Sequence, residues 1–486
     1  MSRRRLKAAN HLGGAMAAKE KLTTAQVGGL AALLIGTLVI TNDFTALNVA
    51  LPAIENAFKV DITTAQWVIS GYALVFGVFL VTAGRLADMF GRRRIFFIGM
   101  AIFCFFSLIG GLAEDAWVLV GARAAMGIGG AMIWPSLIGM IYGILPEQRA
   151  ALAGGLLMGV SGIGNGMGPL LGGVFVEYLS WRWIFFINIP VSIIAVATIY
   201  FTIPKDRDDE ETERIDYPGI ATLSLGLFGL MFMLDIGSDL GWLSPTVISL
   251  FGAAVVLLAI FLYIERQWGV DALIPKDIIA NREFRAANII VLMVAAIYFG
   301  SLLYLPQFMV KELGFSAAEA GAGLLPVLGM FAVSSFLAAP LYDRLGSKMV
   351  ITLGLLCLAV GIYILSWLTA STSFLALMPG MVIVGMGLGL FYSSITTAAI
   401  TSVDENRSSL ASAIVFMVQN AGGAVGLGLT TAIVVTATTL SHGIERAFTV
   451  NAIVAVMAVF ISLLYVAGPL TRENLFPQRR TDENDE

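Results

Sequence analysis

The sequence predicts an all-α membrane protein with fourteen transmembrane helices, and three observations support this fold class. Of the 486 residues, 58% are hydrophobic and 13% are charged, whereas a soluble domain carries about 25% charged residues. The mean hydropathy of +0.87 is too high for a water-soluble fold. The apolar residues also form long runs, and Lys and Arg gather on alternate connections between them.

Each predicted helix corresponds to an apolar run that is long enough to cross a bilayer, which takes roughly 18 or more residues. The fourteen runs lie at about 27–50, 65–84, 94–113, 117–143, 151–174, 181–203, 217–237, 245–264, 286–309, 319–341, 348–369, 373–397, 408–438 and 447–468. The first run is too long for a signal-peptide core and has no small-residue cleavage site. We therefore expect it to remain as a permanent helix.

Several other kinds of chemistry find no support in the sequence. Cys104 and Cys357 lie inside apolar runs and are typical of small core residues, and the two histidines, His11 and His442, lie outside the runs. The phosphate-binding pattern GxxxxGK[ST] does not occur, so we expect no ATP-driven step in this chain. We expect neither an enzyme nor a nucleic-acid-binding protein, and no metal or other cofactor.

The placement of Lys and Arg predicts the orientation in the membrane. With the N-terminus in the cytoplasm, 24 of the 29 Lys and Arg residues fall on inside segments and four fall outside, at Lys59, Arg182, Lys311 and Arg446. Cytoplasmic connections carry such an excess of cations. This predicts a multi-pass protein of the cell membrane with both termini in the cytoplasm, and it leaves Arg123 within the membrane.

The runs fall into groups of six, two and six. The polar stretch "PKDRDDEETERID" at 204–216 separates the first six runs from the next two. In chain order, the predicted parts are a cytoplasmic tail at 1–26, a six-helix bundle at 27–204, a linker with two extra helices at 205–285, a second six-helix bundle at 286–470 and a cytoplasmic tail at 471–486.

The two groups of six share a loop sequence, which predicts a parallel internal repeat. "GRLADMFGRRR" at 84–94 aligns without gaps with "APLYDRLGSKM" at 339–349. The matches are Leu86 with Leu341, Asp88 with Asp343, and Gly91 with Gly346. The glycine permits a tight turn, and Asp88 can pair with Arg92 or Arg93. We expect a cytoplasmic latch that includes Gly84, Arg85 and these residues; the alternative is that the cations only anchor the loop inside.

The helix predicted at 151–174 is unusually rich in glycine, as "GGLLMGVSGIGNGMGPLLGG" at 154–173 shows. Glycine costs about 1 kcal/mol relative to alanine in a helix interior. Four-residue spacings at 155/159, 164/168 and 168/172 predict a stripe on one face that allows close helix approach. Pro169 removes a helix hydrogen bond and favours a bend. We expect Gly164, Gly168, Pro169, Gly172 and Gly173 to belong to a surface where two bundles move; static packing is the alternative.

Two ionisable residues lie within the predicted membrane region. Asp43 is about midway along the first run, and a carboxyl at that depth usually faces a cavity or a partner. Burial disfavours the ionised form, so Asp43 is a candidate for loading and releasing a proton. Arg123 keeps its charge and needs a counter-charge or carbonyl groups. We expect the pair to couple proton binding to movement; a static ion pair and a structural hydrogen-bond centre are the alternatives.

The second half offers candidates for binding an apolar ligand. Gln419 and Asn420 lie inside an apolar run beside several glycines, and aromatic residues occur in two other runs, at Tyr298, Phe299, Phe391 and Tyr392. Each aromatic on its own is more typical of a core or lipid-facing position. Together with Asp43 and the 20 methionines, they favour a cavity for lipophilic cations held by dispersion, ring contacts and one charge.

The loop at 84–94, the repeat and the grouping of runs resemble the major facilitator superfamily, in its fourteen-helix drug:proton antiporter branch. "NDFTALNVALP" at 42–52 is similar to the branch pattern LDxTIVNVALP except at Asn42, Ala46 and Leu47. "LVGARAAMGIGGA" at 119–131 is similar to the family's arginine motif, with Met126 where glutamine is frequent. The glycine helix matches the antiporter motif at every defined position.

This resemblance implies a proton-coupled exporter that needs no cofactor and works by alternating access. The expected partners are small lipophilic molecules, protons and the lipid bilayer, and the expected state is a monomer. The last six runs contain no internal acid, which favours neutral or monocationic substrates. Export of one specific metabolite or lipid is an alternative. A non-transporting sensor or scaffold is a weaker one, because no loop is long enough to hold a soluble domain.

Overall fold

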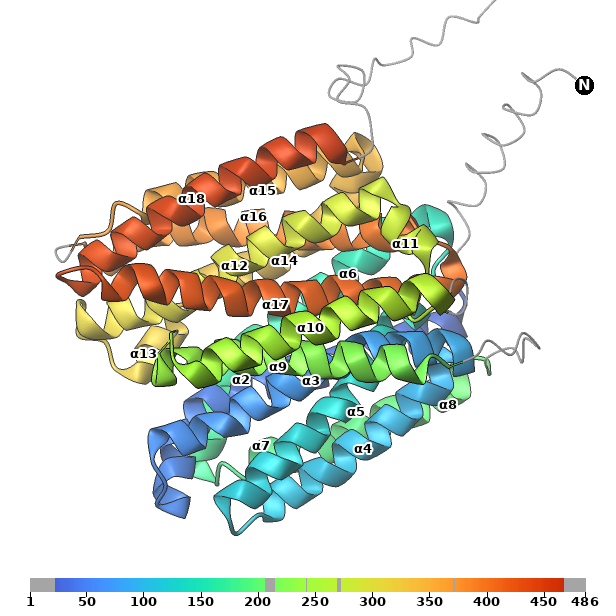
Figure 1. Ribbon diagram of the computed structural model, residues 1–486, viewed down its shortest axis with the longest axis horizontal. Helices are drawn as coiled ribbons and strands as arrows, with labels where there is room; N and C mark the ends of the chain where they lie inside the picture. The colour runs from blue at the N-terminus through green and yellow to red at the C-terminus, as the bar shows by residue number, and fades with distance from the viewer. Residues whose placement is uncertain (1–21, 206–214, 242, 269–271, 370–371, 467–486) are drawn as a thin grey trace, which may run out of the picture.

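The described part of the chain is a set of long helices that lie side by side, with their connections at two opposite ends (Figure 1). The computed structural model describes residues 22–205, 215–241, 243–268, 272–369 and 372–466. The first group of helices is α2 (Thr24–Phe58), α3 (Ile62–Phe90), α4 (Arg92–Leu112), α5 (Ala116–Ile144), α6 (Ala150–Tyr178), α7 (Trp183–Phe186) and α8 (Asn188–Thr202). We call it the N-terminal group.

The rest of the chain adds a helix pair and a second group. The pair is α9 (Tyr217–Leu240) and α10 (Pro245–Trp268), and the short α11 (Lys276–Ala280) follows it. The second group is α12 (Arg282–Lys311), α13 (Ala317–Ala322), α14 (Leu325–Leu345), α15 (Ser347–Leu365), α16 (Phe374–Thr401), α17 (Ser408–Val435) and α18 (Leu440–Tyr465). We call it the C-terminal group.

Thirteen of the described helices are long and apolar enough to cross a membrane, where the sequence predicts fourteen. The remaining predicted run, 217–237, lies in α9, whose described apolar part is the shorter Tyr217–Met233. Most helices extend beyond the apolar runs, because a helix continues through polar residues at its ends. For example, α2 begins at Thr24, where Thr23 and Gln26 form a capping box.

The packing order is the same in both groups. In the N-terminal group α5 packs on α3 and α4, and α2 packs on α6 and α8. In the C-terminal group α16 packs on α14 and α15, and α12 packs on α17 and α18. A close helix approach at glycine also recurs. Gly99 of α4 meets the backbone of α5, and Gly354 of α15 meets the backbone of α16. Gly99 follows the loop glycine Gly91 at the same spacing at which Gly354 follows Gly346. The structure therefore extends the repeat beyond the loop.

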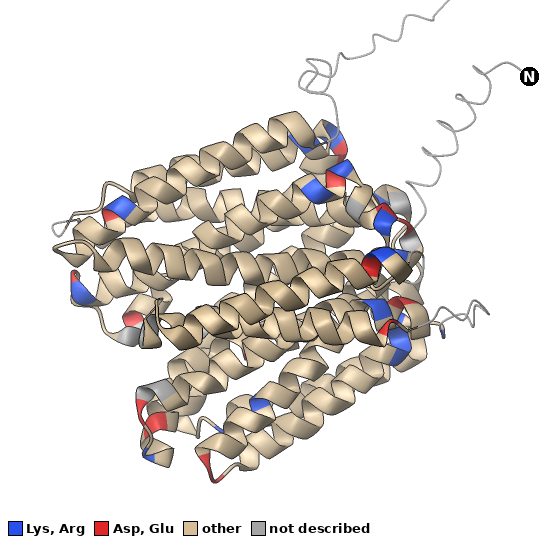
Figure 2. Cartoon of the chain, in the orientation of Figure 1, with Lys and Arg blue, Asp and Glu red and all other residues tan. Residues whose placement is uncertain are grey.

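The two groups meet along two seams. One seam joins α6 to α14 and α16, and the other joins α3 and α5 to α17. The helix pair α9–α10 lies beside the second seam, where α9 contacts both α3 and α17. Figure 2 shows that Lys, Arg, Asp and Glu gather at the two ends of the helices, which leaves an apolar band between them.

Candidate functional site

The centre of the candidate site is an ion pair between Asp43 of α2 and Arg123 of α5. Arg123 Nη1 donates to Asp43 Oδ2 at 2.5 Å, and neither side chain is more than 1% exposed. The sequence predicts that Arg123 needs a counter-charge within the membrane, and the structure supplies Asp43. Removing either partner would leave a buried charge without compensation, which is strongly destabilising.

The Arg123 guanidinium makes two further contacts, both with α3. Its Nε donates to the Val68 carbonyl at 3.0 Å, and its Cζ lies 4.2 Å from the centre of the Tyr72 ring. Both residues are on α3. A cation above an aromatic face is attracted by the ring quadrupole, more strongly where water is absent. The pair therefore links α2, α5 and α3.

A third residue completes the carboxylate's contacts. Asn188, the first residue of α8, donates from Nδ2 to Asp43 Oδ1 at 2.9 Å. The same nitrogen lies 3.3 Å from Ser107 Oγ of α4, and Ser107 in turn donates to the Phe185 carbonyl at 2.8 Å. Each carboxylate oxygen of Asp43 therefore has its own donor, one charged and one neutral.

The predicted latch residue Asp88 makes contacts between the two groups. Its carboxylate accepts hydrogen bonds from the backbone N–H groups of Ser409 and Leu410, at 3.3 and 2.8 Å. These residues form the first turn of α17, where N–H groups lack helix partners and the helix dipole favours negative charge. Arg92 Nε donates to Asp88 at 3.2 Å, and Arg92 Nη1 donates to the Gly139 carbonyl. The carboxylate therefore caps α17 of the opposite group.

Of the two predicted partners for Asp88, the structure selects Arg92. Arg93 instead donates to the carbonyls of Tyr200 and Ile203 and lies over the Tyr200 ring, so it caps the end of α8. Arg85 is buried at the end of α3, within electrostatic reach of Glu265 on α10.

The repeated loops share their backbone but differ in their contacts. Gly91 and Gly346 have φ angles of 97° and 83°, a region that side chains rarely adopt, which confirms the predicted tight turns. Asp88 has a side chain that is 4% exposed, whereas Asp343 is exposed. The structure therefore shows a contact between the groups for only one of the two repeated acids.

Gly84 lies one turn before Asp88 on the same seam. A Cβ at this position would be 2.6 Å from Ala413 Cβ and 2.9 Å from the Ser409 carbonyl oxygen of α17. The absence of a side chain therefore permits the close approach of α3 to α17.

The glycines of α6 form two faces, where the sequence predicts one stripe. Gly155, Gly159 and Gly162 face the C-terminal group, at α14. Gly164, Gly168 and Gly172 face α2 within the N-terminal group; a Cβ on Gly172 would lie 2.4 Å from the Ala46 carbonyl oxygen. Gly155 and Gly164 are nine positions apart, and at about 100° per residue they point in opposite directions.

The predicted substrate residues are only partly together. The Tyr392 ring centre lies 6.4 Å from that of Tyr298 and 6.3 Å from that of Phe331, and Gln419 lies beside Tyr392. Tyr392 Oη and Gln419 Oε1 have no hydrogen-bond partner in the described structure. Phe331 also meets Gly162 of α6, so this aromatic cluster reaches the N-terminal group.

Phe299 and Phe391 lie at the edge of this cluster, with ring centres 5.3 Å from that of Tyr298 and 5.1 Å from that of Tyr392, and both also pack against other helices. Phe391 is fully buried where α16 packs on α15, at Gly354. Phe299 covers Gly423 of α17, and Asn420 lies near Gly77 of α3. Asp43, enclosed by Arg123 and Asn188, is separate from the aromatic cluster in this state.

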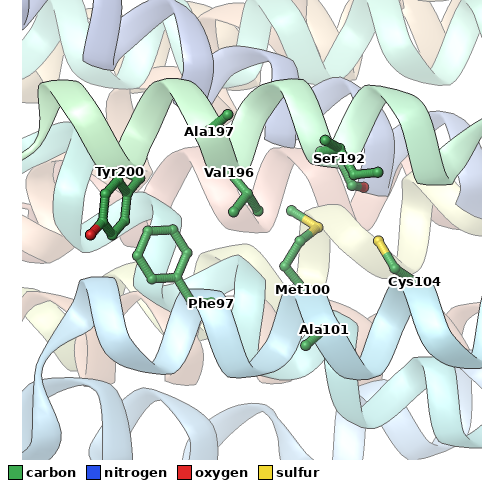
Figure 3. A pocket seen from close by; sticks show the side chains of 9 residues that line it. Phe97, Met100, Ala101, Cys104, Ser192, Val196, Ala197 and Tyr200 are labelled. Atoms are coloured by element: carbon green, nitrogen blue, oxygen red, sulfur yellow. The ribbon is translucent and has the colours of Figure 1, made fainter.

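The structure also holds a groove between α4 and α8 with a volume of about 400 Å³ (Figure 3). Phe97, Met100 and Cys104 line one side, and Ser192, Val196 and Tyr200 line the other. None of the predicted substrate residues lines this groove. Tyr200 is 57% exposed, so the groove opens on the outer surface of the N-terminal group.

Sequence reasoning missed four residues of these sites. Asn188 and Ser107 complete the ion-pair site; an amide within the run 181–203 was the available signal for Asn188. Phe331 belongs to the aromatic cluster. Trp134 lies 5.1 Å, centre to centre, from Phe416 across the second seam. An aromatic residue in the middle of a run gives only a weak signal, because most such residues face the core or lipid.

Taken together, the apolar helices, the repeated packing and the buried ion pair define a multi-pass membrane protein of the secondary-transporter class. The chain belongs to the Major Facilitator Superfamily, whose family model matches residues 33–427 and, in a second match, 287–483.

Several relatives and solved structures are similar to the chain. It is 33% identical to the puromycin resistance protein pur8 of Streptomyces alboniger, over 91% of this chain and 88% of the relative. It is 30% identical to the multidrug resistance protein Stp of Mycobacterium tuberculosis, over 85% and 77%. The crystal structure of the human organic anion transporter MFSD10 has the same fold, with a TM-score of 0.68 at 12% identity, over 90% of this chain and 100% of that one.

Proposed function

We propose that this protein is a proton-driven antiporter that exports lipophilic or amphipathic drugs across the cell membrane. The observation that carries the proposal is the Asp43–Arg123 ion pair, which puts a protonatable carboxyl beside a permanent cation inside membrane-spanning helices. Relatives named for resistance to puromycin, to tetracenomycin C and to several drugs support the export of such compounds.

The proposed architecture is that of the sequence prediction. Residues 27–204 and 286–470 form two six-helix bundles, and residues 205–285 add the pair α9–α10. Together with the other thirteen spans, α9 also crosses the membrane, which makes fourteen. Both termini lie in the cytoplasm, and the protein acts as a monomer. The matching packing order of the two groups supports the division, and the excess of Lys and Arg on one side supports the orientation.

Proton coupling follows from the chemistry of the ion pair. A proton that enters from outside binds the Asp43 carboxylate, and Arg123 keeps its charge but loses its counter-charge. The pair then separates, and α2 and α5 take up the other arrangement. Release of the proton to the cytoplasm restores the attraction, so each cycle moves one proton inward at this site.

Alternating access uses the two seams. The contacts of Asp88 and Gly84 with α17 hold one end of the molecule closed in this structure. Under the proposed orientation this is the cytoplasmic end. Opening it separates α3 from α17, and the glycines that face α14 allow α6 to move against the C-terminal group.

The aromatic cluster is the proposed substrate region. It carries rings and the unpartnered oxygens of Tyr392 and Gln419 but no acid. Such a surface binds a bulky apolar molecule by dispersion and ring contacts, and Asp43 offers at most one negative charge. We therefore propose neutral or monocationic substrates.

Purified protein in sealed vesicles with an imposed proton gradient tests the proposal. Cationic dyes, neutral drugs and puromycin are added in turn, and proton release and substrate movement are recorded together. Wild-type protein is expected to release protons when a substrate is added. Asp43→Asn keeps the shape of the side chain and a hydrogen-bond acceptor but cannot be protonated in the same way, so it is expected to lose gradient-driven transport.

Insertion and folding of the variant are checked by membrane fractionation and thermal unfolding in detergent. Normal gradient-driven transport by a folded Asp43→Asn protein would contradict the coupling role. Failure of every compound in the panel to move protons through the wild type would contradict drug:proton antiport.

A further inference from the structure

Among the described residues, Asn188 provides the one neutral hydrogen-bond donor to the Asp43 carboxylate. Its side chain is 2% exposed, and its Nδ2 donates to Asp43 Oδ1 at 2.9 Å while Arg123 donates to Oδ2. An amide N–H stabilises an ionised carboxylate and repels a proton on the same oxygen. The two oxygens of Asp43 therefore differ: one is held by a permanent cation and the other by an amide.

The orientation of the Asn188 amide is itself determined by its neighbours. Nδ2 also lies 3.3 Å from Ser107 Oγ, whose own hydrogen points to the Phe185 carbonyl. Since that hydrogen is used, Ser107 can only accept from Asn188. The amide nitrogen, not the amide oxygen, is therefore held toward Asp43.

The charged and titratable groups around Asp43 are few among the described residues. Arg123 comes from α5, and Tyr72 comes from α3, with its ring beneath the guanidinium. The other packed elements present neutral groups: α4 presents Ser107, α8 presents Asn188, and α6 meets α2 through glycines. Asn188 is therefore the neutral side chain with the most direct effect on the charge of Asp43.

We propose that Asn188 is a positioning residue for the Asp43–Arg123 pair, which stabilises the ionised carboxylate and directs an incoming proton to Oδ2. This oxygen becomes available only when Arg123 moves away, so proton uptake and separation of the pair occur together. The inference rests on the proposed function, since it assigns a role within proton coupling.

The pH dependence of transport tests this role. Asn188→Leu replaces the amide with an apolar group of similar size. Loss of a hydrogen bond to a charged group corresponds to a shift of about 1–2 pH units in the midpoint of transport, toward higher pH. Ser107→Ala keeps the Asn188 amide but removes the hydrogen bond that orients it. We expect a smaller shift of the transport midpoint in the same direction.

A second readout follows the carboxyl directly. Infrared difference spectra of the purified protein, with the Asp43→Asn spectrum subtracted, report the pH at which Asp43 is protonated. The matched control is Asn451→Leu, because Asn451 is a buried membrane asparagine on α18 whose Nδ2 has no partner in the described structure. The control is expected to leave both midpoints unchanged.

The outcomes separate the two proposals. Unchanged midpoints in folded Asn188→Leu and Ser107→Ala would overturn the role of Asn188, even if Asp43→Asn abolishes coupling. If Asn188→Leu does not fold, Ser107→Ala alone decides through its infrared midpoint. Gradient-driven transport by Asp43→Asn would instead overturn the proposed function and leave the infrared result for Asn188 standing.

Discussion

The Asp88 carboxylate at the end of α3 accepts a hydrogen bond of 2.8 Å from the backbone N–H of Leu410 in α17, 322 positions later in the chain. The acid of the repeated loop therefore caps a helix of the opposite group. A cap of this kind contributes about 0.5–2 kcal/mol. In a transporter, this stabilisation applies only to the state in which the end of α3 lies against the start of α17.

Asp88→Asn is expected to shift the protein away from the closed arrangement seen here. Asparagine loses the charge that favours the α17 N-terminus and the pairing with Arg92. A change of about 1 kcal/mol shifts a two-state equilibrium about fivefold. The measurement is the rate at which maleimide labels Ser409→Cys in protein that lacks Cys104 and Cys357. Asp88→Asn is expected to raise this rate, because the start of α17 becomes accessible. Asp343→Asn, at the exposed repeat position, is the control, and equal effects of both variants would contradict the cap.

Gly84→Ala and Gly168→Ala are expected to act in different ways. The methyl group at Gly84 meets α17 only across the seam between the groups, at 2.6 Å from Ala413 Cβ, so it disfavours closure. The methyl group at Gly168 meets the α2 backbone, 2.9 Å from the Ala46 nitrogen, so it disfavours the folded N-terminal group in every state. Overpacking of this kind typically costs about 1–3 kcal/mol.

The labelling assay and thermal unfolding distinguish these two effects. Gly84→Ala should raise the labelling of Ser409→Cys with little loss of thermal stability. Gly168→Ala should lower thermal stability without changing the labelling of the protein that remains folded. If instead Gly168→Ala raised the labelling and Gly84→Ala lowered thermal stability, the face of α6 that packs on α2 would be the surface that moves during transport.

Substrate charge provides a third prediction. Among the described residues the proposed substrate region holds no acid, and the charge of Asp43 is already paired with Arg123. Each positive charge on a substrate would therefore be desolvated without a counter-charge, at a cost of several kcal/mol. Monovalent quaternary ammonium compounds should therefore be exported better than divalent compounds of similar size. Resistance of cells that express the protein measures this, and equal protection against both series would show that substrate charge is not selected.

Asn420→Asp extends this test by adding a carboxyl to α17, close to Gly77 of α3. We expect improved resistance to divalent compounds and little change for neutral ones. Asn451→Asp, on α18, provides the control for a new acid in the C-terminal group. If Asn451→Asp improves resistance to divalent compounds as much as Asn420→Asp does, the improvement does not depend on the position of Asn420.

The cap of α9 gives a prediction about pH. Asp216 Oδ1 accepts from the Gly219 N–H at 2.8 Å, and burial raises the pKa of Asp216 above its usual value. The folded state therefore binds a proton on Asp216 more tightly than the unfolded chain does. This contribution to stability is present at low pH and is lost as the pH rises through the folded pKa.

Asp216→Asn keeps a good N-cap and removes this titration. At pH 7 the variant should be at least as stable as the wild type in detergent, and the difference should shrink as the pH falls from the raised folded pKa toward the ordinary value of about 3.9. Asp216→Ala lacks the cap and should be less stable by about 1 kcal/mol. A difference between Asp216→Asn and wild type that grows at low pH would contradict this account.

Much of the fold follows from local sequence. The backbone of a membrane helix satisfies its own hydrogen bonds, so a long apolar run specifies a helix nearly independently of its neighbours. This is why the predicted runs correspond to helices and why Gly91 and Gly346 could be placed in tight turns. The predicted ends were less accurate, because helices such as α2 continue past the apolar residues to capping groups.

Site residues were predictable where the residue type is rare in a membrane. Asp43 and Arg123 stand out because a charge at that depth requires a partner. Asn188, Ser107 and Trp134 did not stand out, since polar and aromatic residues of these types occur at many positions in membrane helices. Their importance comes from what they contact.

The sequence by itself determined the membrane class, the position of nearly every span, the repeated loop and the two charged residues, Asp43 and Arg123, in the middle of membrane helices. Only the tertiary structure decided that Asp88 caps α17, that the α6 glycines form two opposite faces, and that Asn188 holds Asp43. The physical reason is that lipid is as apolar as the helix contacts themselves. Hydrophobicity therefore indicates that a helix forms, but it does not indicate which of its faces meets which neighbour, and that choice depends on close packing and hydrogen bonds between distant segments.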